Sequence, residues 1–220
     1  MIEIKNLTKI YPQNTVYENF NVSFKKGEIT CLLGESGCGK TTLLNVLANL
    51  TEYSGQVPKL NVSYIFQKPN LLPNLTVYQN LQIVNNDRVK IESLLKSCGL
   101  TEKSAAYPNE LSSGQAQRVS IARAFLYPSN VILMDDPFAS LDLKLKLSMA
   151  KTFVETQRKE GRTAIFVTHD IDEALMLSNR IIVLKKGKIS ADIQPQNQTL
   201  PREYGSCEDL RKTIIAALLQ

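Results

Sequence analysis

Long hydrophobic runs are absent from this sequence of 220 residues. No apolar stretch reaches the ~18 residues that a membrane-spanning helix requires. If the protein serves a membrane process, other subunits must therefore cross the bilayer. The chain opens with Met1-Ile2-Glu3-Ile4, an alternating pattern that is typical of a strand, and we expect no secretory signal peptide.

Cysteine and histidine are scarce. The four cysteines, Cys31, Cys38, Cys98 and Cys207, lack metal-ligand spacing, and we expect reduced thiols in a cytoplasmic protein. The 26 basic and 21 acidic residues give a net charge of only +5. This charge fits an ordinary solvated surface, and a basic face toward nucleic acid or lipid headgroups is the alternative. Hydrophobic residues make up 43% and charged residues 21%, which is typical of a soluble domain with a proper core.

Strand and helix patterns alternate along most of the chain, which predicts an α/β fold with a largely parallel sheet. Strands are predicted at 2–4, 22–24, 29–33, 64–66, 130–135, 163–168 and 180–185. Helices are predicted at 41–49, 87–99, 112–126, 142–160, 170–178 and 207–220. Lys185-Lys186-Gly187 is typical of a hairpin turn, and residues 194–206 are polar and loop-like.

A glycine-rich loop joins the predicted strand at 29–33 to a helix. Its residues 34–41 fit the phosphate-binding pattern GxxxxGK[ST] in the strand–loop–helix setting that the pattern needs. Glycines let successive backbone N–H groups turn toward phosphates at a helix N-terminus, where negative charge is favoured. We expect Lys40 to reach the β- and γ-phosphates and the Thr41 hydroxyl to bind Mg²⁺. The predicted nucleotide-binding residues here are Gly34, Glu35, Ser36, Gly37, Cys38, Gly39, Lys40, Thr41 and Thr42.

Two carboxylates, Asp135 and Asp136, end the apolar strand that begins at Val131. A carboxylate in the low-dielectric mouth of a sheet needs a partner. In phosphate-loop enzymes that partner is Mg²⁺, which predicts Asp135 as a metal-binding residue.

Between the phosphate loop and these carboxylates lies Leu111-Ser112-Ser113-Gly114-Gln115. A phosphate loop, an LSxGQ signature and an acidic strand end, in this order, resemble the ATP-binding cassette (ABC) ATPases over nearly the whole chain. The resemblance implies a phosphate-loop NTPase core with a mostly parallel sheet, an N-terminal antiparallel β part and a helical subdomain. In these terms 1–220 is a single ABC ATPase domain. Residues 1–70 and 129–220 form its RecA-like core with the β subdomain, and 71–128 form the helical signature subdomain.

The residue after Asp135 departs from the family. The family usually has a glutamate there, which polarises the attacking water, and this chain has Asp136. Aspartate is one methylene shorter, so its carboxylate sits about 1 Å back, and a misplacement of that size costs on the order of 100-fold in rate. Two alternatives follow: a slow ATPase with Asp136 as the working carboxylate, or a cassette that binds ATP without hydrolysing it.

Three other residues match the family by type and place. His169, the only histidine, follows the strand at 163–168, where the family places a histidine against the γ-phosphate; an ordinary surface histidine or a satisfied core histidine is the alternative. Gln67 follows the strand at 64–66 and matches the glutamine that contacts Mg²⁺ and the attacking water. Tyr11 matches the aromatic residue that stacks on adenine, or else it is a buried strand-edge tyrosine. Stacking tolerates any base, so other nucleoside triphosphates also fit.

In the family the signature caps a γ-phosphate held by a second subunit, so that two cassettes enclose two ATP molecules. Residues 112–115 are therefore predicted to contact a partner's nucleotide at a helix start, which suits an anion. Asp142 belongs to the loop that crosses between subunits. The implied mechanism is ATP-driven closure of a dimer, with a homodimer expected, and hydrolysis reopens it. Ser113 stands where the family usually has glycine, which costs about 1–2 kcal/mol if the position needs a positive φ and little otherwise.

Segments 71–77 and 168–174 resemble the ATPase subunits of bacterial importers, particularly the nitrate, sulfonate, taurine and thiamine-precursor group. The short segment 55–66 and the expected lack of a further C-terminal domain also fit this compact group. The apolar stretch 71–84 would then receive a helix of the permease, or else it packs internally. An exporter cassette and a non-hydrolysing regulatory subunit are the alternatives.

The resemblance implies ATP, Mg²⁺, a second cassette, permease subunits and, indirectly, a solute-binding protein. It implies a peripheral place on the cytoplasmic face of the cell membrane. Nucleic acid is not an expected partner, because a cassette of DNA repair or translation would need a coiled-coil insertion or a second cassette. The transported solute is chosen by other subunits.

Overall fold

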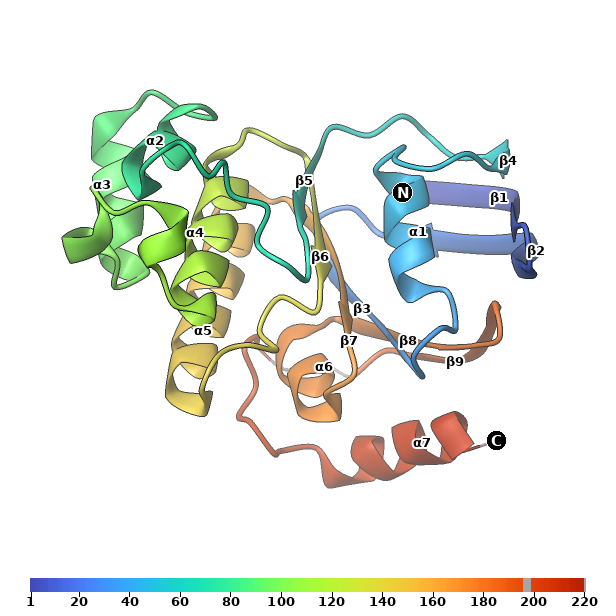
Figure 1. The fold of residues 1–220 in the computed structure, drawn as a ribbon. Helices are drawn as coiled ribbons and strands as arrows, with labels where there is room; N and C mark the ends of the chain where they lie inside the picture. Colours follow the sequence, from blue (N-terminus) through green and yellow to red (C-terminus); the bar gives the residue numbers. More distant parts are fainter. Residues whose placement is uncertain (196–198, 220) are drawn as a thin grey trace.

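The computed structural model describes residues 1–195 and 199–219 (Figure 1). Part of the stretch predicted as a polar loop, 196–198, lies outside the described residues, as does the end of the predicted last helix at 220. The strands are β1 (Ile2–Tyr11), β2 (Asn14–Phe24), β3 (Ile29–Gly34), β4 (Ser54–Gln56), β5 (Val62–Ile65), β6 (Val131–Asp135), β7 (Thr163–Thr168), β8 (Arg180–Lys185) and β9 (Lys188–Ile193). The helices are α1 (Lys40–Leu47), α2 (Val77–Gln82), α3 (Arg88–Ser97), α4 (Ser113–Leu126), α5 (Leu143–Glu160), α6 (Ile171–Leu177) and α7 (Glu208–Leu219).

The strands of the described residues form two sheets. The smaller is antiparallel, with the order β2-β1-β4. The larger has the order β5-β6-β7-β3-β8-β9, in which the first five strands are parallel and β9 runs antiparallel to β8. This arrangement confirms the predicted α/β fold with a mostly parallel sheet and an N-terminal antiparallel part.

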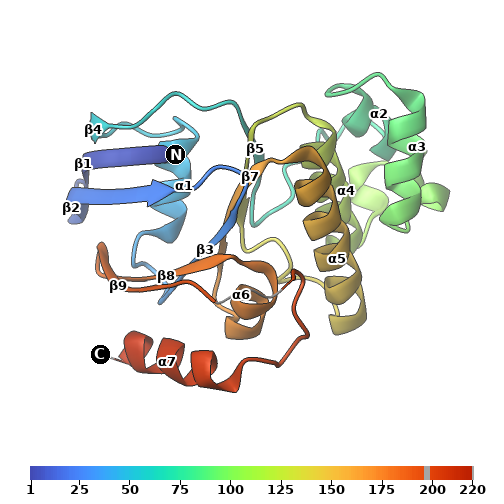
Figure 2. The same ribbon diagram turned by 180° about the vertical axis from the view of Figure 1, so that it is seen from behind.

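Layers of apolar side chains cover both faces of the larger sheet. Strands β3, β6 and β7 are buried throughout, as expected for parallel strands between two layers. Along β6, Ile132 and Met134 join the core under α4, α5 and α6, while Val131 and Leu133 join the core under α1 and the antiparallel sheet. Successive strand residues point to opposite faces, so a single strand supplies both cores. Figures 1 and 2 show α1 on one side of the sheet and α4 with α5 on the other.

The N-terminal strands are much longer than their sequence pattern predicts. Strands β1 and β2 pair over most of their length, but the register shifts between Ile4 and Leu7 and twice more toward Tyr11. Within these strands, Asn6 and Asn19 have left-handed φ angles of 52° and 49°. Such irregularities break the two-residue alternation on which strand prediction depends. For this reason only the start of β1, at 2–4, and the end of β2, at 22–24, were predicted. The short strand β4 and helix α2 were not predicted.

The strand order brings the carboxyl ends of β3, β6 and β7 to one edge of the sheet, where ligands of α/β proteins commonly bind. Asp135 is in register with Val167, so the residues that follow β6 and β7 lie side by side. Helices α2, α3 and α4 fall within the stretch 71–128 that was predicted to be helical. Across the ranges 1–195 and 199–219, no helix has the length and apolar character needed to cross a bilayer.

Candidate active site

The glycine-rich loop runs from the end of β3 to the start of α1, as predicted. Gly39 has a left-handed φ of 112°, and a Cβ there would lie 2.7 Å from the Tyr17 hydroxyl. That hydroxyl donates to the Gly39 carbonyl at 2.9 Å. Burial raises the pKa of Tyr17 well above its ordinary value, so the phenol keeps the proton that it donates. A buried side chain of β2 therefore fixes the loop at the helix start.

Lys40 folds back over the loop. Its Nζ donates to the carbonyl oxygens of Gly34 and Glu35, both at 2.7 Å. Beside it lies a cleft of about 390 Å³ formed by the loop, the start of β2 and the β8–β9 hairpin turn. Its lining residues are Asn14, Thr15, Val16, Glu35, Ser36, Gly37, Cys38, Lys186 and Gly187. The hairpin is tied to the loop, because the Gly187 N–H donates to the Cys38 carbonyl at 3.2 Å.

Sequence reasoning missed the cleft residues from β2 and the hairpin, since only folding joins them to the phosphate loop. Tyr11 lies at the end of β1, 39% exposed, with its ring centroid 4.4 Å from the Lys9 ammonium. It does not line this cleft. Its predicted adenine contact stays a prediction.

Asp135 lies buried at the end of β6. Burial raises its pKa, and the hydrogen bond from the Thr41 hydroxyl opposes that rise without cancelling it. A buried carboxylate that disfavours its own negative charge is a good ligand for a cation. The oxygen atoms of Asp135 and Thr41 suit Mg²⁺, which prefers oxygen ligands. Gln67 lies exposed two residues beyond β5, and its predicted metal contact stays a prediction.

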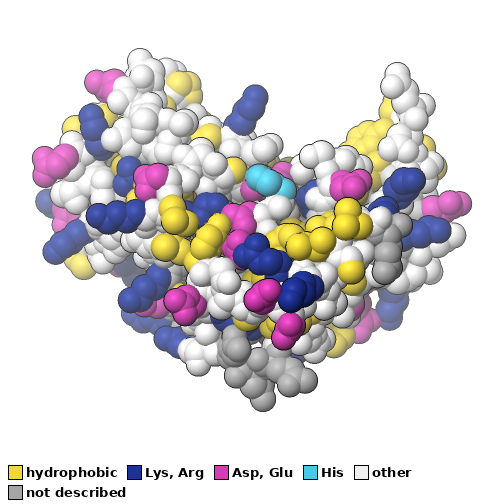
Figure 3. Space-filling model, turned by 90° about the horizontal axis from the view of Figure 1, so that it is seen from below, with side chains coloured by type: hydrophobic (Ala, Val, Ile, Leu, Met, Phe, Trp, Pro, Cys, Tyr) yellow, Lys and Arg dark blue, Asp and Glu magenta, His cyan; other side chains and the backbone are white. Residues whose placement is uncertain are grey.

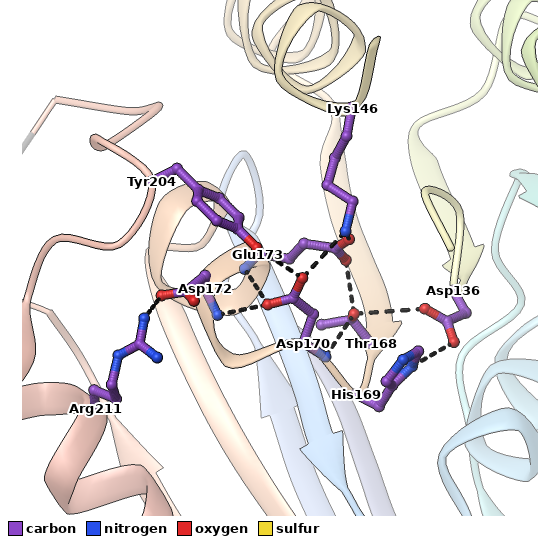
Figure 4. A network of polar contacts seen from close by, with 9 residues as sticks. All are labelled: Asp136, Lys146, Thr168, His169, Asp170, Asp172, Glu173, Tyr204 and Arg211. Atoms are coloured by element: carbon purple, nitrogen blue, oxygen red, sulfur yellow. Dashed lines mark hydrogen bonds and ion pairs between the residues drawn. The ribbon is translucent and has the colours of Figure 1, made fainter. Parts of the chain in front are cut away.

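Asp136 and His169 come together across the ends of β6 and β7 (Figure 4). His169 Nδ1 lies 2.8 Å from Asp136 Oδ2. The Asp136 N–H donates to the Val167 carbonyl at 2.9 Å, and the Thr168 hydroxyl lies 3.5 Å from Asp136 Oδ1. The carboxylate is 13% exposed, whereas the imidazole is 71% exposed and lies open on the surface in Figure 3. Two of the three predicted catalytic residues therefore form one acid–base pair that faces solvent, while the third, Gln67, is not part of it.

A buried ion pair lies behind this dyad and was not predicted. Lys146 Nζ lies 2.5 Å from Glu173 Oε1 and 3.1 Å from Asp170 Oδ2. The Thr168 hydroxyl donates to Glu173 Oε2 at 2.7 Å, and Glu173 is 1% exposed. Burial raises the pKa of Glu173, and Lys146 and Thr168 only partly offset the rise. The only sequence feature that could have indicated this ion pair was the acidic run at 170–173, and such a run is typical of an ordinary helix start.

The signature forms the N-terminus of α4. Ser112 caps the helix: its Oγ accepts the Gln115 N–H at 3.2 Å, while Gln115 Oε1 accepts the Ser112 N–H at 2.9 Å. Ser113 is the first helical residue and has no positive φ, so it carries no left-handed strain. A Cβ on Gly114 would lie 3.4 Å from the Ser140 carbonyl, so the signature packs against the segment that leads to Asp142.

Helices α1 and α4, which begin at the phosphate loop and at the signature, lie on opposite faces of the sheet (Figures 1 and 2). Within one chain the structure therefore does not bring the signature to the phosphate loop. Asp142 caps α5 and accepts the Leu145 N–H at 3.0 Å. Its predicted place in the nucleotide site stays a prediction.

Gln117 on α4 is a further residue that sequence reasoning missed. It is buried, and its Nε2 donates to the carbonyls of Phe66 at 3.4 Å and Pro137 at 3.1 Å. These carbonyls immediately precede Gln67 and follow Asp136. The signature helix is thus hydrogen-bonded to the loops that carry Gln67 and Asp136.

Known proteins share this order of motifs and this fold. The family described as ABC transporter matches residues 17–139, which contain the phosphate loop, Gln67, the signature, Asp135 and Asp136. This chain belongs to the ABC transporter family. The dimeric bacterial ABC transporter cassette MJ0796 has a TM-score of 0.82 at 30% identity, covering 90% of this chain and 100% of its own. A dimeric post-hydrolysis state of MJ0796 bound to ADP and Pi gives the same TM-score at 29% identity.

Curated relatives of this ABC cassette carry names of import proteins. The spermidine/putrescine import ATP-binding protein PotA of Pasteurella multocida is 40% identical over 217 residues, covering 89% of this chain and 59% of the relative. The chain thus spans less than two thirds of that relative. The aliphatic sulfonates import ATP-binding protein SsuB 1 of Paracoccus denitrificans is 37% identical over 229 residues, covering 99% of this chain and 93% of the relative.

Proposed function

We propose that this ABC cassette is the ATP-hydrolysing subunit of a bacterial importer and acts as a dimer beneath separate permease subunits. The observation that carries this proposal is the Asp136–His169 pair, 2.8 Å apart. The pair lies at the edge of the sheet where β3 leads into the phosphate loop. A carboxylate base held by an imidazole, beside a loop built for phosphates, suits the attack of water on a γ-phosphate.

Nucleotide binding rests on the loop and on Lys40. The ammonium can move from the carbonyls of Gly34 and Glu35 to the β- and γ-phosphates, while N–H groups at the α1 N-terminus donate to the phosphate oxygens. Thr41 and Asp135, with Gln67, would hold Mg²⁺, which when bound neutralises charge on the β- and γ-phosphates. The raised pKa of the buried Asp135 supports this assignment, because a cation would relieve that cost.

In the proposed reaction the water oxygen attacks the γ-phosphorus as the bond from phosphorus to the β–γ bridging oxygen breaks, yielding ADP and phosphate. Asp136 accepts the proton that water loses. His169 holds Asp136 through Nδ1, and its exposed imidazole is free to contact the γ-phosphate. The Asp136 backbone places the short side chain: the Asp136 N–H donates to the Val167 carbonyl, and the φ of Asp136 is 48°.

The separation of the signature from the phosphate loop within one chain supports a dimer in which each signature faces the partner's nucleotide. The dimeric cassette MJ0796 supports the same arrangement. Relatives named for polyamine, ferric-ion and sulfonate import support an importer. The sulfonate relative matches 99% of this chain. This match supports the narrower proposal that the importer belongs to the nitrate, sulfonate, taurine and thiamine-precursor group. The cassette would then lie at the cytoplasmic face of the membrane.

The permease is proposed to dock on the stretch 71–84. Val77 and Leu81 of α2 are buried, whereas Leu72 and Ile83 are exposed. The stretch therefore packs internally on one side and presents apolar side chains on the other, next to an open hollow lined by Pro73 and Tyr107.

The test is Mg-ATP hydrolysis by the purified protein beside Asp136→Asn and Asp136→Glu. Turnover by the native protein that is lost in Asp136→Asn supports Asp136 as the working carboxylate. Native turnover equal to the Asp136→Asn background, with hydrolysis by Asp136→Glu, would instead identify an ATP-binding clamp whose partner subunit hydrolyses. Co-purification with permease subunits and a solute-binding protein separates an importer from an exporter.

A further inference from the structure

The C-terminal segment, which we define as residues 199–219, returns to α6 and holds the far end of that helix. Arg202 is buried, and its Nη1 donates to the carbonyls of Leu175 at 2.6 Å and Ser178 at 2.8 Å. The Arg202 N–H donates to the Met176 carbonyl at 2.9 Å. The last carbonyls of a helix lack partners within the helix, so these bonds complete the C-terminal end of α6.

The same segment also reaches the beginning of α6 (Figure 4). The Tyr204 hydroxyl donates to Asp170 Oδ2 at 3.2 Å, and the Arg211 guanidinium pairs with the Asp172 carboxylate. Burial, and then the charge of Asp170, raises the pKa of Tyr204, so the phenol keeps the proton that it donates. Arg211 is held in place because α7 packs on α6, β8 and β9, and Ile214 of this helix is buried in the core. The C-terminal segment thus contacts α6 at both of its ends.

Asp170, the residue after His169, is the point where these contacts converge. Its Oδ1 accepts two backbone N–H groups of the first turn of α6, at 2.8 and 3.3 Å. Its Oδ2 accepts from Lys146 at 3.1 Å and from Tyr204. Its own N–H donates to the Thr168 hydroxyl at 3.1 Å. The residues on both sides of His169 are therefore hydrogen-bonded, although the imidazole is open to solvent.

We propose that Tyr204 and Arg211 are positioning residues for His169: the C-terminal segment holds Asp170 and Asp172, and through them the imidazole against Asp136. This inference rests on the proposed role of His169 in hydrolysis. Lys146 is shared between Asp170 and Glu173, so it alone does not hold the Asp170 carboxylate in one place. Without Tyr204, Asp170 keeps its bonds from Lys146 and from the first turn of α6 but loses the bond from the C-terminal segment. The pull of Lys146 is then unopposed, so the first turn of α6 shifts toward α5 and His169 moves with it.

The test combines steady-state kinetics with one NMR signal. His169 is the only histidine, so its Cε1–H resonance in the full chain without a histidine tag reports this residue alone. Tyr204→Phe and Arg211→Gln should each lower kcat about tenfold, less than the roughly 100-fold cost of a full 1 Å displacement, with KM for Mg-ATP unchanged. Both should shift or broaden the His169 resonance, and Arg211→Lys should restore much of the turnover.

Lys212→Gln is the matched control, because it removes one positive charge from α7 at a residue that pairs with Glu208 within the same helix. It should leave kcat and the resonance at their native values. A His169→Ala variant that hydrolyses at the native rate would overturn the proposed role of His169 itself. If His169→Ala is inactive while folded Tyr204→Phe and Arg211→Gln keep native kcat and an unmoved resonance, the positioning inference alone is overturned. Should Tyr204→Phe fail to fold, the Arg211→Gln and Arg211→Lys pair decides.

Discussion

The imidazole Nδ1 of His169 lies 2.8 Å from Asp136 Oδ2, and Asp136 reaches it from a left-handed backbone. Its φ of 48° falls in a region that costs most residues energy but that aspartate and asparagine adopt more readily. This provides a physical reason for aspartate at the end of β6. The backbone turns sharply there, and a short side chain suffices to meet the histidine.

A comparison of Asp136→Ala with Asp136→Asn tests that backbone argument. Both variants lose the carboxylate, but alanine lacks a side chain suited to the left-handed region. We expect the alanine variant to be less stable than the asparagine variant by about 1 kcal/mol. For a chain of this size, the difference corresponds to a Tm lower by about 2–4 °C in calorimetry without nucleotide. Equal Tm values would contradict a left-handed Asp136.

Ser113→Gly restores the residue that the family usually has in the signature. Because Ser113 already has a right-handed helical backbone, glycine relieves no strain there and adds freedom to the unfolded chain. We expect a loss of up to about 1 kcal/mol of stability, measured by urea denaturation. Ser112→Ala, which removes the helix cap, should cost about 1 kcal/mol for comparison. A more stable Ser113→Gly protein would rule out this backbone assignment.

Asp170 should contribute stability that depends on pH. Burial alone would raise its pKa, but the hydrogen bond from Lys146 and the N–H groups of α6 outweigh burial, so the pKa lies below its ordinary 3.8. A lowered folded pKa means that the unfolded chain binds the proton more tightly, so this stability is present above about pH 4 and is lost as the pH falls. Native protein should therefore exceed Asp170→Asn in Tm most at pH 7, and the gap should narrow below pH 4. A gap that is constant from pH 7 to pH 3 would refute this.

Local sequence patterns predicted those parts of the site that are contiguous in the chain. The phosphate loop needs only a strand, its glycines and a helix start, and all of these lie within 29–49. The roles of Asp136 and His169 were predicted separately, and their pairing was not predicted, since it depends on β6 and β7 being neighbours in the sheet. The places of Tyr204, Arg211 and Gln117 had no signal in the sequence, because each bonds to a segment 20 or more residues away through a side chain that is common on any surface.

The buried Lys146–Glu173 pair provides a strong test of what supports the site. Lys146→Met leaves Glu173 buried without its cation, and breaking a buried pair in this way costs about 3–5 kcal/mol. The matched control is Lys151→Met on the same helix, where the exposed pair with Glu155 is worth at most about 1 kcal/mol. Urea denaturation of both variants at pH 7 measures the difference.

The loss in Lys146→Met should also shrink in acid. Without the ammonium, burial raises the pKa of Glu173 further above its unfolded value, so the folded state binds the proton more tightly than the unfolded chain. The variant should therefore gain stability relative to the native protein as the pH falls from 7 toward 5, because the buried carboxylate is then neutralised by a proton. A loss of unfolding free energy at pH 7 no larger than that of Lys151→Met would mean that Glu173 finds another partner. A cost that does not change with pH would mean that lost packing of the Lys146 side chain, rather than the unpaired charge, destabilises the variant.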